Sequence, residues 1–160
     1  IIRCFDIYRD GSIEQLVYPV SKGSMKGIYT EESRGKIYED MVDLLREETD
    51  SENTIVVLGC NPWVYLDASA SCGAYTTWEI RGNESGMRQY YKKLPEKIPD
   101  VILCVPEELG RYVSWRYSSH GSGQHINEQV TLEGILSEIV TDNEYECLKK
   151  NGCIIFKQRF

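Results

Sequence analysis

Uninterrupted apolar runs stand out from the mixed pattern of hydrophobic and polar positions along this chain. The runs "TIVVLG", "VILCV" and "IIF" occupy residues 54–59, 101–105 and 154–156. The first two show no alternation between apolar and polar positions, which is typical of strands buried on both faces in a parallel sheet. We therefore predict adjacent or near-adjacent parallel strands at about 54–59 and 100–105.

The segment "TEESRGKIYEDMVDLLREETD", which follows a glycine-containing loop, carries the clearest helical period of the chain. Its apolar stripe consists of Ile37, Met41, Leu44 and Leu45. These residues recur at the spacing of one helix face, so we predict a helix that covers a sheet. Thr30 and Ser33 are the alternative N-terminal caps.

The remaining segments alternate between strand and helix signals. The predicted elements are a hairpin with an Asp10-Gly11 turn, a loop over "SKGSMKGIYT", a short helix over "PWVYLDA", a strand over "CGAYTTW", a helix over "NESGMRQYYKKL", a long loop over "EELGRYVSWRYSSHGSGQHINEQ", a helix over "TLEGILSEIV" and a final hairpin with an Asn151-Gly152 turn. Such alternation predicts a three-layer α/β sandwich with a mostly parallel, Rossmann-like sheet and an antiparallel C-terminal hairpin. The length fits one domain, with an N-terminal hairpin at 1–20, an α/β core at 21–141 and the C-terminal hairpin at 142–160.

The charge balance excludes some partners. The formal net charge is −7, whereas a nucleic-acid surface or an anionic-lipid surface calls for a basic patch. The apolar runs are also far shorter than the ~18 residues that a membrane-spanning helix needs. We therefore expect no nucleic-acid partner and a chain that is itself soluble.

Sequence motifs that carry catalysis or bind cofactors are absent. The chain has no GxSxG elbow, no GxGxxG, no Walker lysine motif and no HExxH, so we predict no cofactor. His120 and His125 share a loop without a third ligand nearby, which leaves a metal site unsupported. Asp67, Glu79 and Glu107 are the only carboxylates that we would assign to a cleft, and nothing in their spacing makes them converge. We predict no catalytic residue.

Six cysteines are spread along the chain without a CxxC pair or a compact framework. We expect mostly reduced thiols, with Cys60 and Cys104 buried. If any disulfide forms, we expect it between Cys147 and Cys153, which flank the final hairpin turn.

Aromatic and polar residues gather in the stretch "GCNPWVYLDASASCGAYTTW". In open α/β sheets, ligands bind beyond the carboxyl ends of the strands. The candidate ligand-binding residues at that edge are Asn61, Trp63, Thr77, Trp78 and Glu107. Aromatic faces beside hydrogen-bonding groups suit a saccharide. The interpretation that we favour is that Trp63 and Tyr65 pack the crossover, with Trp63 mostly buried and Trp78 partly exposed.

Several of these motifs together resemble a known group of proteins. "GSMKGIYT", "TIVVLGCNPWVYL", "GAYTTW" and "QYYKKLPEKIPDVI" resemble the C-terminal region of large multi-pass membrane proteins of Firmicutes. These proteins look like GT-C-type glycosyltransferases or cell-surface polysaccharide proteins and are mostly uncharacterised. The likeness spans about Lys22 to Ile102, with a weaker match in "NGCIIFKQRF".

This resemblance implies an extracytoplasmic domain at the cell membrane whose partner is its own membrane domain. It implies a non-catalytic accessory role in cell-surface polysaccharide assembly, with a glycan or lipid-linked sugar as a second partner. The alternatives are a glycan-binding module, or a small α/β transferase or hydrolase with an unrecognised site. The discriminating feature is the parent gene, which should encode many membrane helices upstream of Ile1.

Overall fold

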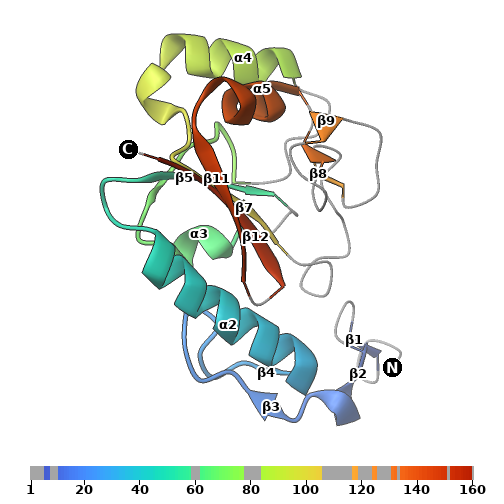
Figure 1. The fold of residues 1–160 in the computed structure, drawn as a ribbon. Coiled ribbons are helices and arrows are strands. Elements are labelled where there is room, and N and C mark those ends of the chain that lie inside the picture. The colour runs from blue at the N-terminus through green and yellow to red at the C-terminus, as the bar shows by residue number, and fades with distance from the viewer. Residues whose placement is uncertain are drawn as a thin grey trace.

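The computed structural model has a mixed α/β fold (Figure 1). The residues that it describes are 6–7, 11–58, 62–77, 84–105, 117–118, 124–125, 131–132, 134–150 and 152–159. Its elements, in chain order, are β1 (Asp6–Ile7), β2 (Gly11–Ser12), the 3₁₀ turn η1 (Ile13–Gln15), β3 (Tyr18–Pro19), β4 (Tyr29–Thr30), α2 (Glu32–Glu48), β5 (Thr54–Leu58), α3 (Val64–Asp67), β6 (Ser71–Cys72), α4 (Glu84–Lys93), the 3₁₀ turn η2 (Pro95–Lys97), β7 (Val101–Cys104), β8 (Tyr117–Ser118), β9 (Gln124–His125), β10 (Thr131–Leu132), α5 (Gly134–Asp142), β11 (Tyr145–Lys150) and β12 (Cys153–Gln158).

The main sheet has five strands in the order β11-β12-β7-β5-β6. β5 is parallel to β7 and to β6, and all residues of β5 and β7 are buried. The predicted pair of adjacent, doubly buried parallel strands is therefore confirmed. β12 is antiparallel to β7 and to β11, which confirms the C-terminal hairpin. Because this hairpin joins the sheet directly, the sheet is mixed rather than mostly parallel.

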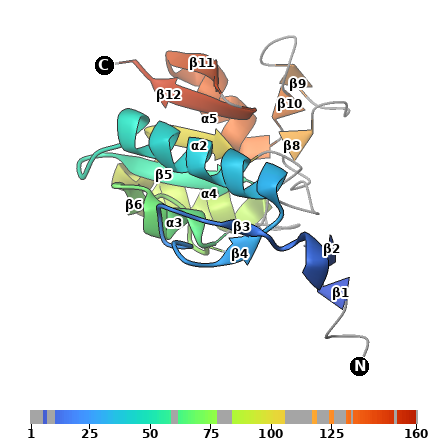
Figure 2. The ribbon, with the colours of Figure 1, turned by 90° about the horizontal axis from the view of Figure 1, so that it is seen from below.

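Helices cover both faces of this sheet (Figures 1 and 2). Along β5, Ile55 and Val57 point toward the face that α2 and α3 cover, and they form a core with Met41 and Leu45 of α2. The alternate residues of β5 point toward α4 and α5, where a second core includes Met87, Tyr91, Leu136 and Ile139. Alternate side chains of the buried strand β5 thus contribute to two cores on opposite faces of the sheet. Its sequence therefore shows no alternation of apolar and polar residues.

Helix α2 confirms the predicted helix. Its first turn follows Glu31, which makes no side-chain cap, so neither Thr30 nor Ser33 acts as the cap. Met41, Leu44 and Leu45 of the predicted stripe are buried, whereas Ile37 is only half-buried. The helix buries a second set of residues as well, including Gly35 and Tyr38, because it is covered on two sides.

The second cover of α2 is a two-stranded antiparallel ribbon of β3 and β4. Tyr18, Val20 and Thr30 share the face that points toward the helix, and a Cβ added at Gly35 would lie 2.3 Å from the Tyr18 ring. Such close approach requires glycine at this point of the helix.

The predicted N-terminal hairpin is present but shorter than expected. β1 pairs with β2, with Ile7 opposite Gly11, so Gly11 belongs to the second strand and the predicted Asp10-Gly11 turn is wrong. The second strand ends at Ser12, and η1 begins at the next residue.

The predicted loop over "SKGSMKGIYT" is wrong for its last two residues, which form β4. The loop ends in a bulge, because the Gly27 N–H donates to the Val20 carbonyl oxygen and the Val20 N–H donates to the Ile28 carbonyl oxygen. Gly27 has a φ of +88°, as a bulge of this type requires.

The long predicted loop between β7 and α5 lies mostly outside the described residues. Its β8 and β9 both pair with β10, which follows the predicted loop, in a small antiparallel sheet that the sequence patterns did not predict. The last helix is confirmed as α5, although Thr131 and Leu132 belong to β10 rather than to the helix. Gly152 in the final turn has a φ of +78°, a left-handed backbone conformation that glycine adopts readily.

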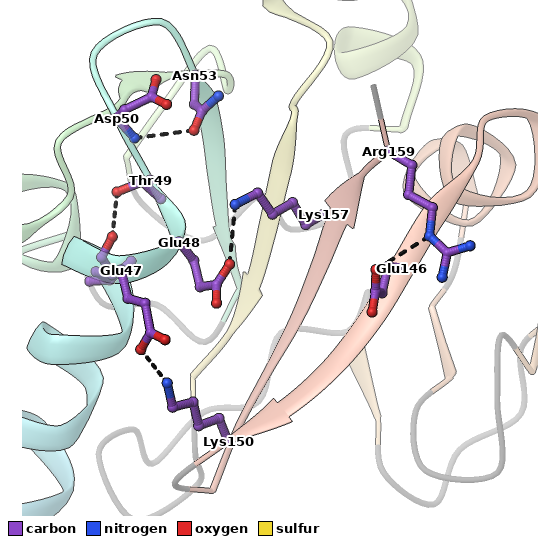
Figure 3. Close-up of polar contacts among 10 residues, drawn as sticks. Glu47, Glu48, Thr49, Asp50, Asn53, Glu146, Lys150, Lys157 and Arg159 are labelled. Carbon is purple, nitrogen blue, oxygen red and sulfur yellow. Dashed lines mark hydrogen bonds and ion pairs between the residues drawn. The ribbon is translucent and has the colours of Figure 1, made fainter.

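Ion pairs connect the end of α2 to the C-terminal hairpin (Figure 3). Lys157 Nζ lies 3.1 Å from Glu48 Oε2, and Lys150 pairs with Glu47. The helix itself ends where Thr49 Oγ1 donates to the Leu45 carbonyl oxygen at 2.6 Å. No helix within the described ranges is both long and apolar enough to cross a bilayer.

Candidate functional site

The carboxyl ends of β5, β6 and β7 lie at one edge of the sheet, where the ligand-binding candidates were predicted. Thr77 is exposed and follows β6, and Trp63 is half-buried and directly precedes α3. Asn61, Trp78 and Glu107 lie outside the described residues, so their grouping with the other two stays a prediction.

Trp63 packs against the scaffold. Its ring meets the Tyr38 ring of α2 edge to face, with centroids 5.1 Å apart. It also contacts the core beneath α2 and α3. This arrangement favours the packing interpretation for Trp63, although its side chain is half-buried rather than mostly buried.

The Tyr65 hydroxyl bonds to the edge of β5 at a point where a neighbouring strand was predicted. The Val57 N–H on the edge of β5 donates to the Tyr65 hydroxyl at 3.0 Å. The strand predicted over "CGAYTTW" is wrong for residues 73–77, because β6 ends at Cys72 and the Tyr65 hydroxyl takes the position of the next strand acceptor. Burial raises the pKa of Tyr65, so this hydroxyl stays protonated and serves hydrogen bonding rather than nucleophilic chemistry.

Of the three carboxylates that were assigned to a cleft, Asp67 is the one that the structure describes. It holds a loop in place. It accepts hydrogen bonds from the Ser24 N–H at 2.5 Å and the Ser24 hydroxyl at 3.0 Å. The Tyr38 hydroxyl donates to the same carboxylate at 2.7 Å and accepts from the Met25 N–H at 3.1 Å. Asp67 therefore fixes the β3–β4 connection against α2. Glu79 and Glu107 lie outside the described residues.

Sequence reasoning missed a second engaged carboxylate, Glu39 of α2. Its exposed fraction is 9%. It accepts from the Ser21 N–H at 2.6 Å, the Ser21 hydroxyl at 2.7 Å and the Tyr18 hydroxyl at 2.8 Å. Burial raises the pKa of the Glu39 carboxyl, but these hydrogen bonds outweigh burial and hold it below its usual value. The helical period of the sequence did not reveal it, because its partners Tyr18 and Ser21 lie outside the helix.

The most exposed aromatic group among the described residues of the stretch is Tyr75. Its exposed fraction is 41%, and its ring meets the half-buried Tyr90 of α4 edge to face at 6.2 Å. Tyr90 in turn lies against Tyr91, with ring centroids 5.5 Å apart. Tyr91 is buried, and its hydroxyl oxygen has no hydrogen-bond partner within the part of the chain that the structure describes. The pair of Tyr75 and Tyr90 is thus an aromatic surface two residues from Thr77.

The thiols support structure. Cys104 and Cys153 are buried and reduced, as predicted for Cys104, whereas Cys60 lies outside the described residues. Burial raises the pKa of Cys153 to about 12 and that of Cys104 well above its usual range, so both are unreactive near neutral pH. The side chains of Cys147 and Cys153 pack into the cores on opposite faces of the sheet. Because their side chains point apart, a disulfide between them is not compatible with this hairpin.

The described residues therefore form a scaffold of buried hydroxyls and carboxylates with an aromatic rim. They contain no group of three or more metal-ligating side chains. His125 is described only as part of β9, and His120 lies outside the described residues. Comparisons of the chain with protein-family models, curated proteins and solved structures found no match.

Proposed function

We propose that this chain is a non-catalytic accessory domain of a multi-pass, glycosyltransferase-like membrane protein. In this proposal it lies on the extracytoplasmic side of the cell membrane and assists cell-surface polysaccharide assembly, with its own membrane domain as partner. In this proposal, the domain is a Rossmann-like three-layer sandwich. Its starting point is the resemblance of residues 22–102 to such proteins.

The observation that carries an accessory role is the outward face of the β3–β4 ribbon. Val17 and Tyr29 are 67% and 59% exposed, and Pro19 pairs directly with Tyr29 on the same face. The opposite face of the ribbon already packs on α2. Contiguous exposed apolar patches mark contact surfaces, so we infer that a partner binds this side of the ribbon.

The engaged carboxylates add support. Asp67 and Glu39 accept hydrogen bonds from the β3–β4 ribbon and the loop that joins its strands. Asp100 accepts from the Thr54 N–H at 2.7 Å and so fixes the start of β5 beside β7. A carboxylate that holds two chain segments together is a poor candidate for proton transfer to a substrate. These three groups therefore favour a structural role for the described part of the domain.

Cysteine labelling in the full-length parent protein tests both the side of the membrane and the contact. In a background without other reactive thiols, Lys93→Cys on the exposed end of α4 is the control, and Tyr29→Cys is the probe. A membrane-impermeant maleimide should label Lys93→Cys in intact cells and label Tyr29→Cys only after the domain is released from the membrane part. Labelling of Lys93→Cys only after permeabilisation would contradict the extracytoplasmic assignment. Equal labelling of both would contradict the contact.

A turnover assay separates the accessory role from the alternative of a small α/β enzyme. The isolated domain should hydrolyse no glycoside, ester or nucleotide sugar. Turnover that Glu107→Gln or His120→Ala abolishes would favour a transferase or hydrolase instead.

A glycan-binding module is the second candidate, and the pair of Tyr75 and Tyr90 favours it. An exposed tyrosine face can stack on a sugar ring while nearby hydroxyls, such as that of Thr77, bond to its polar rim. Titration with chito-oligosaccharides and cello-oligosaccharides should then perturb the Tyr75 ring resonances. A Tyr75→Ala variant that binds these sugars as well as the wild type would remove this candidate.

A further inference from the structure

Among the residues that the structure describes, β11 forms one edge of the main sheet and pairs on one side only, with β12. Figure 2 shows β11 at the end of the sheet opposite β6. Its first four residues are half-buried, and Lys149 and Lys150 are exposed. An edge strand of this length presents backbone hydrogen-bonding groups along one side, which is a ready template for another strand.

The direction of these backbone groups follows from the hydrogen bonds at the end of the hairpin. The Gln158 N–H donates to the Asp100 carbonyl oxygen on the β7 side, and the Arg159 N–H donates to Glu144, both at 2.8 Å. Bonding alternates along an antiparallel pair, so Glu146 and Leu148 direct their backbone groups toward β12. The alternate residues, among them Lys149, direct theirs away from β12, toward the edge.

The side chains of β11 add a charge pattern to this edge. Glu146, Leu148 and Lys150 alternate along the strand and therefore share one face of the sheet. If a second β11 runs antiparallel about a two-fold axis at Leu148, Glu146 of each copy lies opposite Lys150 of the other copy. The same register brings the two Leu148 side chains together. A register centred on Lys149 would instead place two like charges opposite each other, which is unfavourable.

We propose that β11 is a self-pairing edge, through which two copies of this chain join their sheets by antiparallel β11–β11 contact centred on Leu148. The contact is isologous, so it closes as a dimer. The charges that favour a second copy disfavour most other strands, which gives the edge specificity. Glu146 also pairs with Arg159 at 3.3 Å, and Lys150 pairs with Glu47. Both ion pairs are solvent-exposed, so they compete only weakly with contacts across the dimer.

Sedimentation equilibrium of the whole chain, measured over a range of protein concentrations, tests this proposal. The wild type should show a reversible monomer–dimer equilibrium. Glu146→Lys should weaken the dimer about tenfold or more, because it removes two opposite-charge pairs and creates two like-charge pairs. The double variant Glu146→Lys/Lys150→Glu exchanges the charges and should restore dimerisation. Glu14→Lys, which makes the same charge change as Glu146→Lys at an exposed residue of η1, is the control and should leave the equilibrium unchanged.

A backbone variant provides a second readout. The Lys149 N–H points away from β12, so Lys149→Pro removes a donor that only the partner strand would use. This variant should keep the wild-type circular dichroism spectrum and remain monomeric. A monomeric wild type at all concentrations, a Glu146→Lys dimer of wild-type strength, or a charge-exchanged variant that stays monomeric would each overturn the proposal. A disulfide between two Cys147 residues under oxidising conditions would establish a different register and overturn the one centred on Leu148.

Discussion

Gly23 lies in the connection between β3 and β4, and its substitution tests how tightly this loop packs on α2. The residue has a φ of +72°, and a Cβ at this position would lie 2.1 Å from the Tyr38 hydroxyl oxygen and 2.8 Å from Val42 Cγ2. Tyr38 and Val42 are 2% and 0% exposed, so neither side chain can swing into solvent. Gly23→Ala must therefore displace the loop or disturb the core.

Two physical effects set the expected loss of stability. A non-glycine residue with left-handed backbone geometry costs roughly 1–2 kcal/mol. Forcing an extra methyl group into a well-packed region costs about 1–3 kcal/mol more. Displacement of the Tyr38 hydroxyl also strains its hydrogen bonds to Asp67 and Met25. The free energy of unfolding should therefore fall by about 2–5 kcal/mol in Gly23→Ala.

Gly27→Ala in the same loop is a matched control. Gly27 has a φ of +88°, but a Cβ there would meet nothing within 4 Å. Only the backbone cost applies, so this variant should lose about 1–2 kcal/mol. Urea unfolding followed by circular dichroism gives both values, provided that the denaturant slope stays constant. Trp63 fluorescence reports the local environment, because its ring contacts Tyr38.

The difference between the two variants is the steric cost of Gly23→Ala. Equal losses in Gly23→Ala and Gly27→Ala would refute the argument. Tyr38→Phe adds a second check, because it removes the atom nearest to the added methyl group. In the Gly23→Ala background it should be less destabilising than in the wild type, with a coupling energy of about 0.5–3 kcal/mol. Strict additivity would mean that the methyl group and the hydroxyl do not meet.

Other predictions follow from single buried groups. Tyr91→Phe removes a hydroxyl that has no hydrogen-bond partner among the described residues. The free energy of unfolding of this variant in urea should lie between the wild-type value and about 1 kcal/mol above it. A clear loss of stability would mean that the hydroxyl is hydrogen-bonded. The folded-state pKa of Glu39 is lowered, so its stabilising effect is present above the unfolded pKa of about 4.3 and is lost as the pH falls through the folded value. Glu39→Gln should therefore be less stable than the wild type at neutral pH, with a gap that narrows below about pH 4; a gap independent of pH would contradict this. Cys104 and Cys153 should react with a thiol reagent only after unfolding, and denatured protein without reductant should show at least four thiols; their rapid reaction in the folded state would contradict their burial.

The central strands could be predicted because all of their consecutive residues are buried, which produces an uninterrupted apolar run in the sequence. In β5 every position from Thr54 to Leu58 is buried, so no polar residue interrupts the run. The helix over residues 32–48 was equally clear, since its apolar positions recur at helical spacing. The sequence could not reveal that α2 is covered twice, because Tyr38 and Glu39 carry polar groups. Their burial depends on partners more than ten residues away, such as Ser21 and Asp67.

The small sheet of β8, β9 and β10 shows a related limit of sequence patterns. Each strand has only two residues, which is too short for alternation to produce a signal. The intervening Gly and Ser residues favour a loop, and tertiary pairing overrides that preference. The final hairpin was predictable for the opposite reason, since an Asn-Gly turn joins two strands of six residues each.

The stretch "NPWVYLD" looked like the edge of a site because it combines aromatic and acidic residues after a buried strand. In the structure, α3 is a single short helix whose side chains reach three different elements. Trp63, just before it, contacts Tyr38 of α2, Tyr65 completes the edge of β5, and Asp67 holds the loop after β3. Residues chosen for recognition would point into a common space, whereas these diverge toward separate parts of the scaffold. The chemistry of this stretch is therefore best explained as a clamp that joins α2, the sheet and the ribbon.

Loss of any one of the three contacts should lower the stability of the domain rather than the affinity for a ligand. Tyr65→Phe is the cleanest test. It leaves the Val57 N–H buried without an acceptor, which should cost about 1–3 kcal/mol in urea unfolding, while an unchanged stability would show that the clamp is not needed.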